Sequence, residues 1–242
     1  MANKLIRLAD TLDSMGLHKE ANCVDNILKM IVAGGPCSNK QGWTCVDGYP
    51  SISVAVGPGD IIILGDSQVG GELGRNLKGT RYLSNSSTVD EWVSHTAPGG
   101  GFSDKLISAS RIYIILGGNG GELTDDQRAA GASRGSVVPA SASALIRNIR
   151  SAAPNAKVSW ITPAPPAAGS NDYNDRKDDR ELSNQNIIDG LIEYSDVNVI
   201  NSHEIIREKY HGESWPCNGC HDGIHLRGEP AKHISDAAKN SP

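Results

Sequence analysis

The chain has 242 residues, of which 38% are hydrophobic and 21% charged, proportions typical of a folded globular protein rather than a disordered one. The net charge of −5 and the aromatic content of 5% argue against nucleic acid as a partner, which needs a basic face and aromatic stacking platforms. The acidic balance also argues against an anionic membrane as a partner.

The longest apolar runs, residues 61–64 and 112–116, are far shorter than the roughly 18 residues that a membrane-spanning helix needs. The first thirty residues alternate charged with apolar side chains and so lack the apolar core of a secretory signal. We therefore expect a soluble protein without a signal peptide or transmembrane segment, and the composition leaves its compartment unknown.

Residues 1–32 are predicted to contain a helical hairpin. Apolar side chains recur at helical spacing over residues 3–31, interrupted at Gly16, and glycine commonly follows a helix end. Two alternatives remain open: the helices pack on each other or on the rest of the chain, or they bind a protein partner or a second copy of the chain. Two isolated helices are marginally stable, which favours either kind of contact.

Residues 33–59 are rich in Gly, Pro, Ser and Cys and are expected to form a connection with one short strand at residues 52–56. The pattern changes at residue 60, where the main domain, 60–242, is expected to begin. Four apolar segments then predict buried strands, at residues 60–65, 111–117, 157–162 and 197–200.

Strands that are apolar throughout are typical of a parallel sheet covered on both faces. Helices are expected at residues 69–78, 103–110, 141–153, 181–195 and 228–239, whereas the charged stretch 171–181 is interpreted as a solvated loop. Strands alternating with helices predict a three-layer α/β domain, with functional residues in the loops at the carboxyl ends of the strands.

Two polar motifs follow directly after the first two predicted strands. Gly65-Asp66-Ser67-Gln68 precedes a predicted helix, so the Ser67 hydroxyl lies at a helix N-terminus, where backbone N–H groups favour developing negative charge. Gly117-Gly118-Asn119-Gly120 combines glycines, which let the backbone approach a ligand, with an amide that can donate to an oxyanion.

A third motif, Asp222-Gly-Ile-His225, lies near the end of the chain. An Asp three residues before a His can reach its ring and fix the tautomer, which leaves the other nitrogen free to act as a base. Each motif alone is common by chance. Together, and in this order, they supply the nucleophile, oxyanion donor, orienting acid and base of acyl transfer.

In these motifs the chain resembles the SGNH hydrolase superfamily, also called the GDSL esterases, over about residues 60–240. The resemblance implies a flavodoxin-like α/β/α sandwich with a mainly parallel five-stranded sheet, and ester hydrolysis without a metal or another cofactor. It also implies that Ser67 is the nucleophile, His225 the base and Asp222 the residue that orients the base. Asp66 is expected to brace its loop rather than to react.

The implied oxyanion hole combines the Ser67 backbone N–H, the Asn119 side-chain amide and the N–H of a glycine in the segment 97–104. That glycine is Gly100 or Gly101, and the sequence leaves the choice open. The family usually has an Asp after the Asn of this motif, but this chain has Gly120, which leaves the hydrogen bonding of the loop open.

The five cysteines are an odd number and are too sparse for a disulfide scaffold. Cys217-Asn-Gly-Cys220-His221 has the spacing of c-type haem attachment and of half a zinc site, with Cys37 and Cys45 as distant partners. A disulfide that stiffens the loop before Asp222, or free thiols, are the alternatives that we favour. No metal site and no cofactor is therefore predicted.

The sequence thus predicts a serine ester hydrolase that acts on small acyl esters, foremost the O-acetyl groups of a carbohydrate. The alternative is a non-catalytic glycan-binding or assembly module docked through the N-terminal hairpin. Trp92, Trp215 and Tyr173 could form a sugar platform or pack in the core, and His203 could contact the substrate because it follows the last predicted strand.

Overall fold

The computed structural model describes residues 11, 15, 43–46, 49–98, 102–119, 137–170, 173–212, 214–216 and 225–241. The chain forms two compact units, Met1–Val54 and Ala55–Pro242. The predicted hairpin at residues 3–31 lies outside the described residues except for Thr11 and Met15, so it stays a prediction. Within the described residues, no helix combines the length and apolar character needed to cross a membrane.

The first unit contains a short antiparallel strand pair. β1 (Thr44–Val46) pairs with β2 (Tyr49–Ala55), and the register shifts between Cys45 and Val46. We expected one strand in this region. β1 was not predicted, because a strand of three residues is too short to show a periodic pattern. Cys45 is disulfide-bonded, and the four other cysteines lie outside the described residues.

The second unit contains five parallel strands in the order β4-β3-β5-β6-β7. They are β3 (Ile61–Gly65), β4 (Thr80–Leu83), β5 (Arg111–Ile115), β6 (Lys157–Ile161) and β7 (Val197–Ile200). Four of them are the strands that the apolar segments predicted, which confirms a mainly parallel sheet. β4 was missed because only Tyr82 and Leu83 of its residues are buried, which leaves no continuous apolar run.

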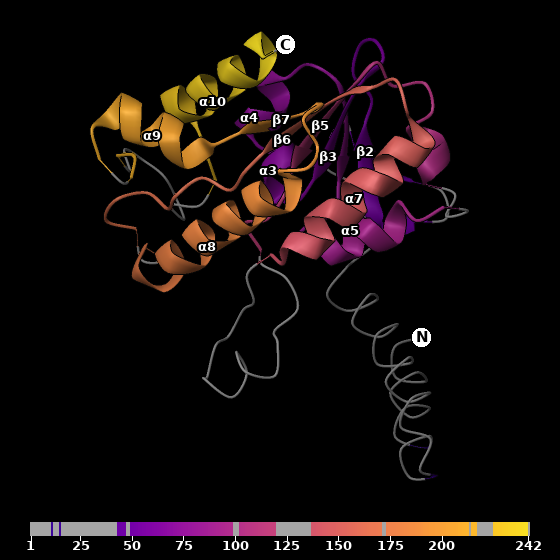
Figure 1. Cartoon of the computed structure of the whole chain (residues 1–242), viewed down its shortest axis with the longest axis horizontal. Helices are drawn as coiled ribbons and strands as arrows, with labels where there is room; N and C mark the ends of the chain where they lie inside the picture. The colour runs from indigo at the N-terminus through magenta and orange to yellow at the C-terminus, as the bar shows by residue number, and fades with distance from the viewer. Residues whose placement is uncertain are drawn as a thin grey trace. The chain divides into compact units, whose positions relative to one another are not determined.

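Helices cover both faces of this sheet (Figure 1), so the three-layer prediction is confirmed. On one face, α7 contacts both α5 and α8, and on the other, α10 contacts both α4 and α9. Two short elements, α3 and η1, complete the described part. The helices are α3 (Ser67–Gly70), α4 (Glu72–Asn76), α5 (Val89–His95), η1 (Ser103–Lys105), α7 (Pro139–Ala152), α8 (Tyr173–Leu191), α9 (Ser202–Tyr210) and α10 (Gly228–Asn240).

The charged stretch 171–181 is not the solvated loop that we expected, because α8 begins at Tyr173. Asp178 and Glu181 are exposed, whereas Arg180 retains only 3% of its accessible surface. In a helix, residues on one face pack against the rest of the domain even where the segment is rich in charge. The charge of the segment alone therefore does not reveal which residue is buried. Arg180 therefore enters the interior of the domain.

α5 and α9 were also missed, although the sequence contains a signal for α5. Thr88 and Glu91 form a capping box, in which the Thr88 side chain accepts from the Glu91 N–H and the Glu91 carboxylate accepts from the Thr88 N–H. The pattern Thr-x-x-Glu before an apolar residue predicts such a start. At 103–110, the expected helix is reduced to the single turn of η1.

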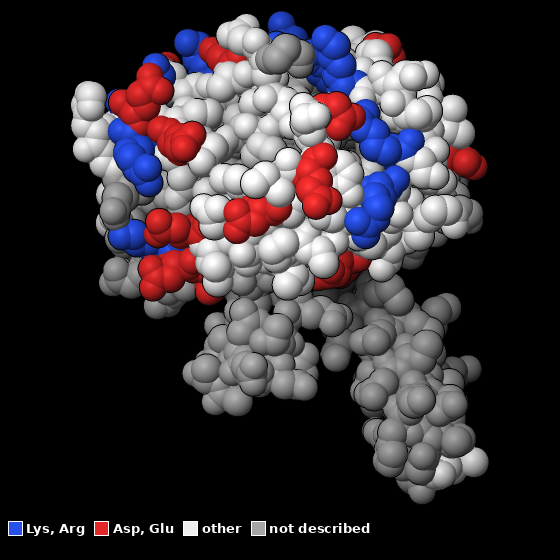
Figure 2. Space-filling view, in the orientation of Figure 1, with Lys and Arg blue, Asp and Glu red and all other residues white. Residues whose placement is uncertain are grey.

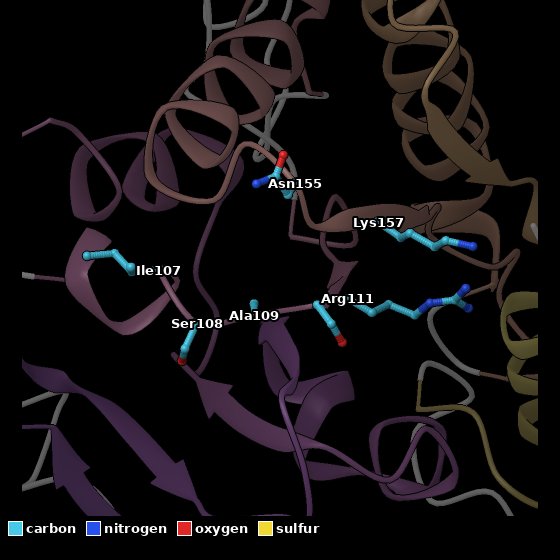
Figure 3. Close-up of a pocket in the computed structure, with 7 residues that line it drawn as sticks. Ile107, Ser108, Ala109, Arg111, Asn155 and Lys157 are labelled. Atoms are coloured by element: carbon cyan, nitrogen blue, oxygen red, sulfur yellow. The ribbon is translucent and has the colours of Figure 1, made fainter.

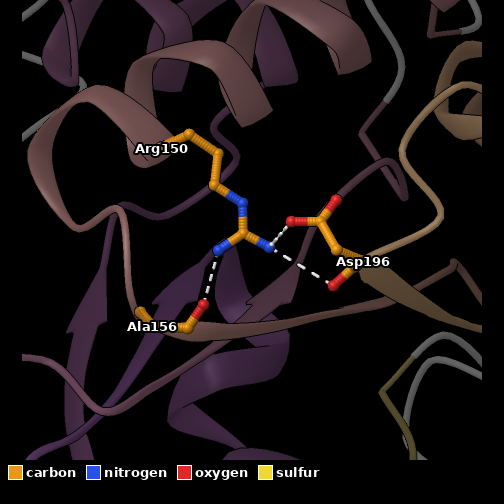
Figure 4. A network of polar contacts seen from close by, with 3 residues as sticks. All are labelled: Arg150, Ala156 and Asp196. Carbon is orange, nitrogen blue, oxygen red and sulfur yellow. Dashed lines mark hydrogen bonds and ion pairs between the residues drawn. The ribbon is translucent and has the colours of Figure 1, made fainter.

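Arg150 of α7 joins the amino ends of two neighbouring strands (Figure 4). Its Nη1 donates to the carbonyl oxygen of Ala156, just before β6, at 2.5 Å. Its Nη2 lies 2.5 Å from Asp196 Oδ2 and donates to the Asp196 carbonyl oxygen at 3.3 Å, just before β7. One guanidinium thus fixes the positions from which β6 and β7 start.

An open hollow of about 530 Å³ also lies at the amino ends of the strands, beside Arg111 of β5 and Lys157 of β6 (Figure 3). The predicted site residues follow the carboxyl ends, so this hollow lies at the other end of the sheet from Ser67. On the face in Figure 2, Lys and Arg are interspersed with Asp and Glu, and the described part of that face shows no continuous basic patch.

Candidate active site

Ser67 is placed at the carboxyl end of β3 by a sharp turn. β3 ends at Gly65, whose φ is +155°, a backbone conformation that other residues rarely adopt. A Cβ at this position would also collide with the Ile115 carbonyl oxygen. Asp66 then donates its N–H to the Ile115 oxygen at 3.2 Å and caps α3, which begins with Ser67. The glycine that the motif contains is thus required by the packing of β3 against β5.

The structure brings Ser67 and His225 together although 158 residues separate them in the sequence. The Nε2 atom of His225 lies 2.8 Å from the Ser67 Oγ. Both residues are half-buried. This is hydrogen-bond reach, the arrangement in which an imidazole accepts a hydroxyl proton as the oxygen attacks an electrophile.

Two side chains that the sequence did not reveal hold the chain around His225. The Leu226 N–H donates to Gln68 Oε1 at 3.3 Å, and the Gly228 N–H donates to Glu72 Oε2 at 3.0 Å. The segment that carries His225 is therefore attached to α3 and α4. No local pattern could have revealed these contacts, because each partner lies more than 150 residues away in the chain.

Asp66 is a buried carboxylate that accepts hydrogen bonds at both oxygens. Its Oδ1 accepts from the Gln68 N–H at 3.0 Å, and its Oδ2 accepts from the Asn119 side-chain amide at 3.2 Å. Burial raises the pKa of Asp66 to about 6; the Gln68 N–H and the charges of Arg180 and His225 oppose this rise. The expectation that Asp66 braces its loop agrees with these contacts.

Asn119, the predicted oxyanion donor, follows β5 and lies against the residue before Ser67. Its amide nitrogen donates to Asp66 Oδ2 at 3.2 Å and to the Ser87 carbonyl oxygen at 3.3 Å. Ser87 lies in the loop after β4, so three strand ends meet at this amide. In the free protein the two amide hydrogens thus point at these two acceptors.

Arg180 reaches the same strand ends from α8. Its Nη1 donates to the Ala164 carbonyl oxygen, in the loop after β6, at 2.7 Å. A Cβ built on Gly118 would lie 3.4 Å from Arg180 Nη2 and 3.6 Å from Asp66 Oδ2. The guanidinium and the carboxylate therefore both lie close to Gly118. Sequence reasoning missed Arg180 because we interpreted its segment as a solvated loop.

His203, at the start of α9, lies near enough to Arg180 to be affected by its charge. Burial, together with the positive charges of Arg180 and Arg207, lowers the pKa of His203 to about 4. The imidazole is therefore neutral at neutral pH. The suggestion that His203 contacts substrate stays a prediction.

Several predicted site residues lie outside the described part of the chain. They are Asp222, Gly100 and Gly101, together with Cys217 and Cys220. Among the described residues, no three His, Cys, Asp or Glu side chains form a group that could hold a metal ion.

Two of the tryptophans considered for a sugar platform lie in the core. Trp92 is fully buried and donates its indole N–H to Ser87 Oγ at 2.8 Å. Trp215 is 2% exposed and donates to the Pro165 carbonyl oxygen at 3.0 Å. Neither ring is available for stacking on a sugar, so the alternative of core packing holds for both.

No known protein family and no curated protein matches the sequence. Solved structures do match the fold. A Streptococcus pneumonia protein named after platelet activating factor has 16% sequence identity and a TM-score of 0.53, over 76% of this chain and 84% of its own. The lipase Lip_vut3 from a goat rumen metagenome has 11% identity and a TM-score of 0.50, over 74% and 95% of the two chains.

A catalytic Ser-to-Ala mutant of Axe2, an acetylxylan esterase from Geobacillus stearothermophilus, has 12% identity and a TM-score of 0.50, over 76% of this chain and 94% of its own. Lipases described as GDSL-like are also among the structures that match. The chain therefore shares its three-layer α/β fold with these solved esterase and lipase structures.

Proposed function

We propose that the protein is a serine ester hydrolase. The observation that supports this most is the 2.8 Å separation between Ser67 Oγ and His225 Nε2 at the carboxyl end of a parallel sheet. A neutral imidazole accepts the Ser67 proton as the oxygen attacks the ester carbonyl. The protonated ring then gives this proton to the departing alcohol, and water, activated by the same ring, hydrolyses the acyl-enzyme.

Asp222 orients the imidazole in this mechanism. It precedes His225 by three residues. A carboxylate on the Nδ1 side of the ring fixes the tautomer with an unprotonated Nε2 and stabilises the imidazolium that forms during the reaction. The role follows from the motif and is tested by substitution, as for Ser67 below.

The oxyanion of the tetrahedral intermediate is held by three kinds of donor. The Ser67 N–H lies in the first turn of α3, where backbone donors have no carbonyl partner in their own helix. The Asn119 amide exchanges the Ser87 oxygen, its longer partner at 3.3 Å, for the oxyanion while it keeps its bond to Asp66. The N–H of Gly100 or Gly101 is the third donor.

The substrate that we propose is a small acyl ester, foremost an O-acetyl group on a carbohydrate. An acetylxylan esterase shares the fold, which supports acetyl esters. A lipase shares it too, so the fold alone does not select the acyl group. Among the described residues, the exposed large apolar side chains are all outside the segments 65–71, 117–119 and 225–227, which disfavours a lipid substrate.

Replacement of the nucleophile tests the proposal. We expect Ser67→Ala to lower kcat/KM on p-nitrophenyl acetate by about a thousandfold or more while the protein stays folded. Ser94→Ala, on the exposed face of α5, is the matched control and should keep the wild-type rate. Equal rates in wild type and Ser67→Ala would contradict the proposal and favour a non-catalytic module.

The choice of substrate needs a separate comparison. We expect acetylated xylo-oligosaccharides and p-nitrophenyl acetate to be hydrolysed faster than p-nitrophenyl octanoate. The reverse order would leave the serine hydrolase proposal standing and would contradict the small acyl group.

A further inference from the structure

Arg180 is a buried cation that the proposed chemistry does not use. The residue retains 3% of its accessible surface, and its Nη1 donates to a backbone oxygen at Ala164. Burying a guanidinium is costly unless an opposite charge or hydrogen bonds compensate for the lost water. An anion close to this cation would compensate for part of that cost.

Asp66 is an anion in the right place. Arg180 Nη2 and Asp66 Oδ2 lie 3.4 Å and 3.6 Å from the position that a Cβ on Gly118 would occupy. Both residues also line one small cavity of about 20 Å³, enough for a single water molecule. Because both residues are 3% exposed, the attraction between their charges is stronger than it would be at the surface.

The charge of Asp66 determines how well its carboxylate accepts two hydrogen bonds near the reacting groups. It accepts from the Gln68 N–H, which fixes the first turn of α3, and from the Asn119 amide. A protonated carboxyl group has one oxygen that carries the proton and accepts poorly. Protonation would therefore loosen the start of the nucleophile helix or the oxyanion donor.

We propose that Arg180 is a positioning residue, which keeps Asp66 ionised and thereby holds Asn119 and the first turn of α3 in place for ester hydrolysis. The inference rests on the proposed function. Among the described residues, two charged groups face Asp66: Arg180 from α8, and His225 from the segment before α10 when its ring is protonated. Of these two, only Arg180 stays charged at every pH at which the enzyme would work.

The pH profile of kcat tests this role. In Arg180→Met the midpoint of the acidic limb should rise by about one pH unit or more, the effect of removing one nearby opposite charge. KM should change little, since Arg180 does not touch the substrate. Arg180→Lys, which restores the charge, should return the midpoint toward that of wild type. Arg207→Met, which removes a cation from the exposed side of α9, is the matched control and should leave the profile unchanged.

A second comparison isolates Asp66. In the Asp66→Asn background, Arg180→Met should cause no further shift of the midpoint. If Arg180→Met lowers kcat by one factor at every pH, or shifts the profile equally in the Asp66→Asn background, the inference is overturned. Should Arg180→Met fail to fold, Gly118→Ala serves instead, because its methyl group would contact both charged groups at ordinary distances and should raise the midpoint in the same direction.

The pH dependence of the free energy of unfolding separates this inference from the proposed function, because it requires no substrate. An Asp66 pKa that is raised in the folded state makes stability fall as pH rises toward that pKa. Arg180→Met should move the end of this fall upward by about one pH unit or more, and Gly118→Ala should move it in the same direction by less. A shift in a protein without esterase activity would refute the function and keep the pairing. Activity without any shift would refute the pairing alone.

Discussion

Gln68 Oε1 accepts a hydrogen bond from the Leu226 N–H at 3.3 Å, which attaches the residue after the nucleophile to the residue after the base. The contact spans the same 158 residues as the Ser67–His225 pair beside it. A single amide oxygen thus helps to set the distance over which a proton must move.

Removal of this oxygen should slow the reaction without unfolding the domain. In Gln68→Leu we expect kcat to fall by about tenfold, because the His225 segment loses its attachment to Gln68 and the imidazole leaves its productive position more often. Gln68→Glu keeps an acceptor at this position and should retain more of the activity. The measurement is kcat and KM on p-nitrophenyl acetate, with thermal melting as a check on folding. A kcat in Gln68→Leu equal to that of wild type would show that the contact does not position the base.

Asn119→Ala should lower kcat by about a hundredfold with little change in KM, since an oxyanion donor acts chiefly in the transition state. Asn148→Ala is a matched control on α7, where the amide donates to the Val93 oxygen at 2.9 Å, far along the chain from the motif loops. That variant should lose stability but keep kcat. A rise in KM alone for Asn119→Ala would assign the amide to substrate binding instead.

Asp66 and His203 should affect the pH dependence of stability in opposite directions. The pKa of Asp66 is raised from 3.8 to about 6, so the folded state binds more protons between these values and stability falls as pH rises. The pKa of His203 is lowered from 6.5 to about 4, so its contribution is present above pH 6.5 and is lost as pH falls. Each effect amounts to at most about 3 kcal/mol, and over pH 4 to 6 the two largely cancel.

Single substitutions should reveal each effect in denaturant titrations between pH 4 and pH 7. In Asp66→Asn, the free energy of unfolding should increase with pH, because of these two groups only His203 still titrates. In His203→Gln, it should decrease with pH. Flat curves in both variants would mean that the folded-state pKa values are close to the ordinary ones.

Arg150→Ala should destabilise the domain by about 1–2 kcal/mol, because the Ala156 oxygen and the Asp196 carboxylate lose a charged donor at the start of β6 and β7. Asp196→Ala should cost less, about 0.5 kcal/mol, because that carboxylate is 63% exposed and the bond to Ala156 remains. Chemical denaturation measures both. The specific activity of the folded protein should not change, because Arg150 lies at the opposite end of the sheet from Ser67. Equal losses in the two variants would show that the ion pair, not the bond to Ala156, carries the stabilisation.

The sequence alone determined the features that depend on neighbouring residues. The apolar segments at 60–65 and 111–117 predicted parallel strands, since strands buried on both faces are apolar almost throughout, and the structure has β3 and β5 there. The Gly65-Asp66-Ser67 turn was also predictable, because the end of the strand, the glycine and the start of the helix are adjacent in the sequence. These local rules were enough to select Ser67 and His225 as candidates and to indicate the fold.

Tertiary structure decided everything that joins distant parts of the chain. The contact of Gln68 with Leu226 and the burial of Arg180 beside Gly118 have no local pattern, because each depends on how strands and helices are ordered in space. A charged residue such as Arg180 is normally solvated, and only the packing of α8 against the loop after β6 places it in the interior. Local chemistry therefore selected the reacting groups, whereas long-range packing selected the side chains that hold them.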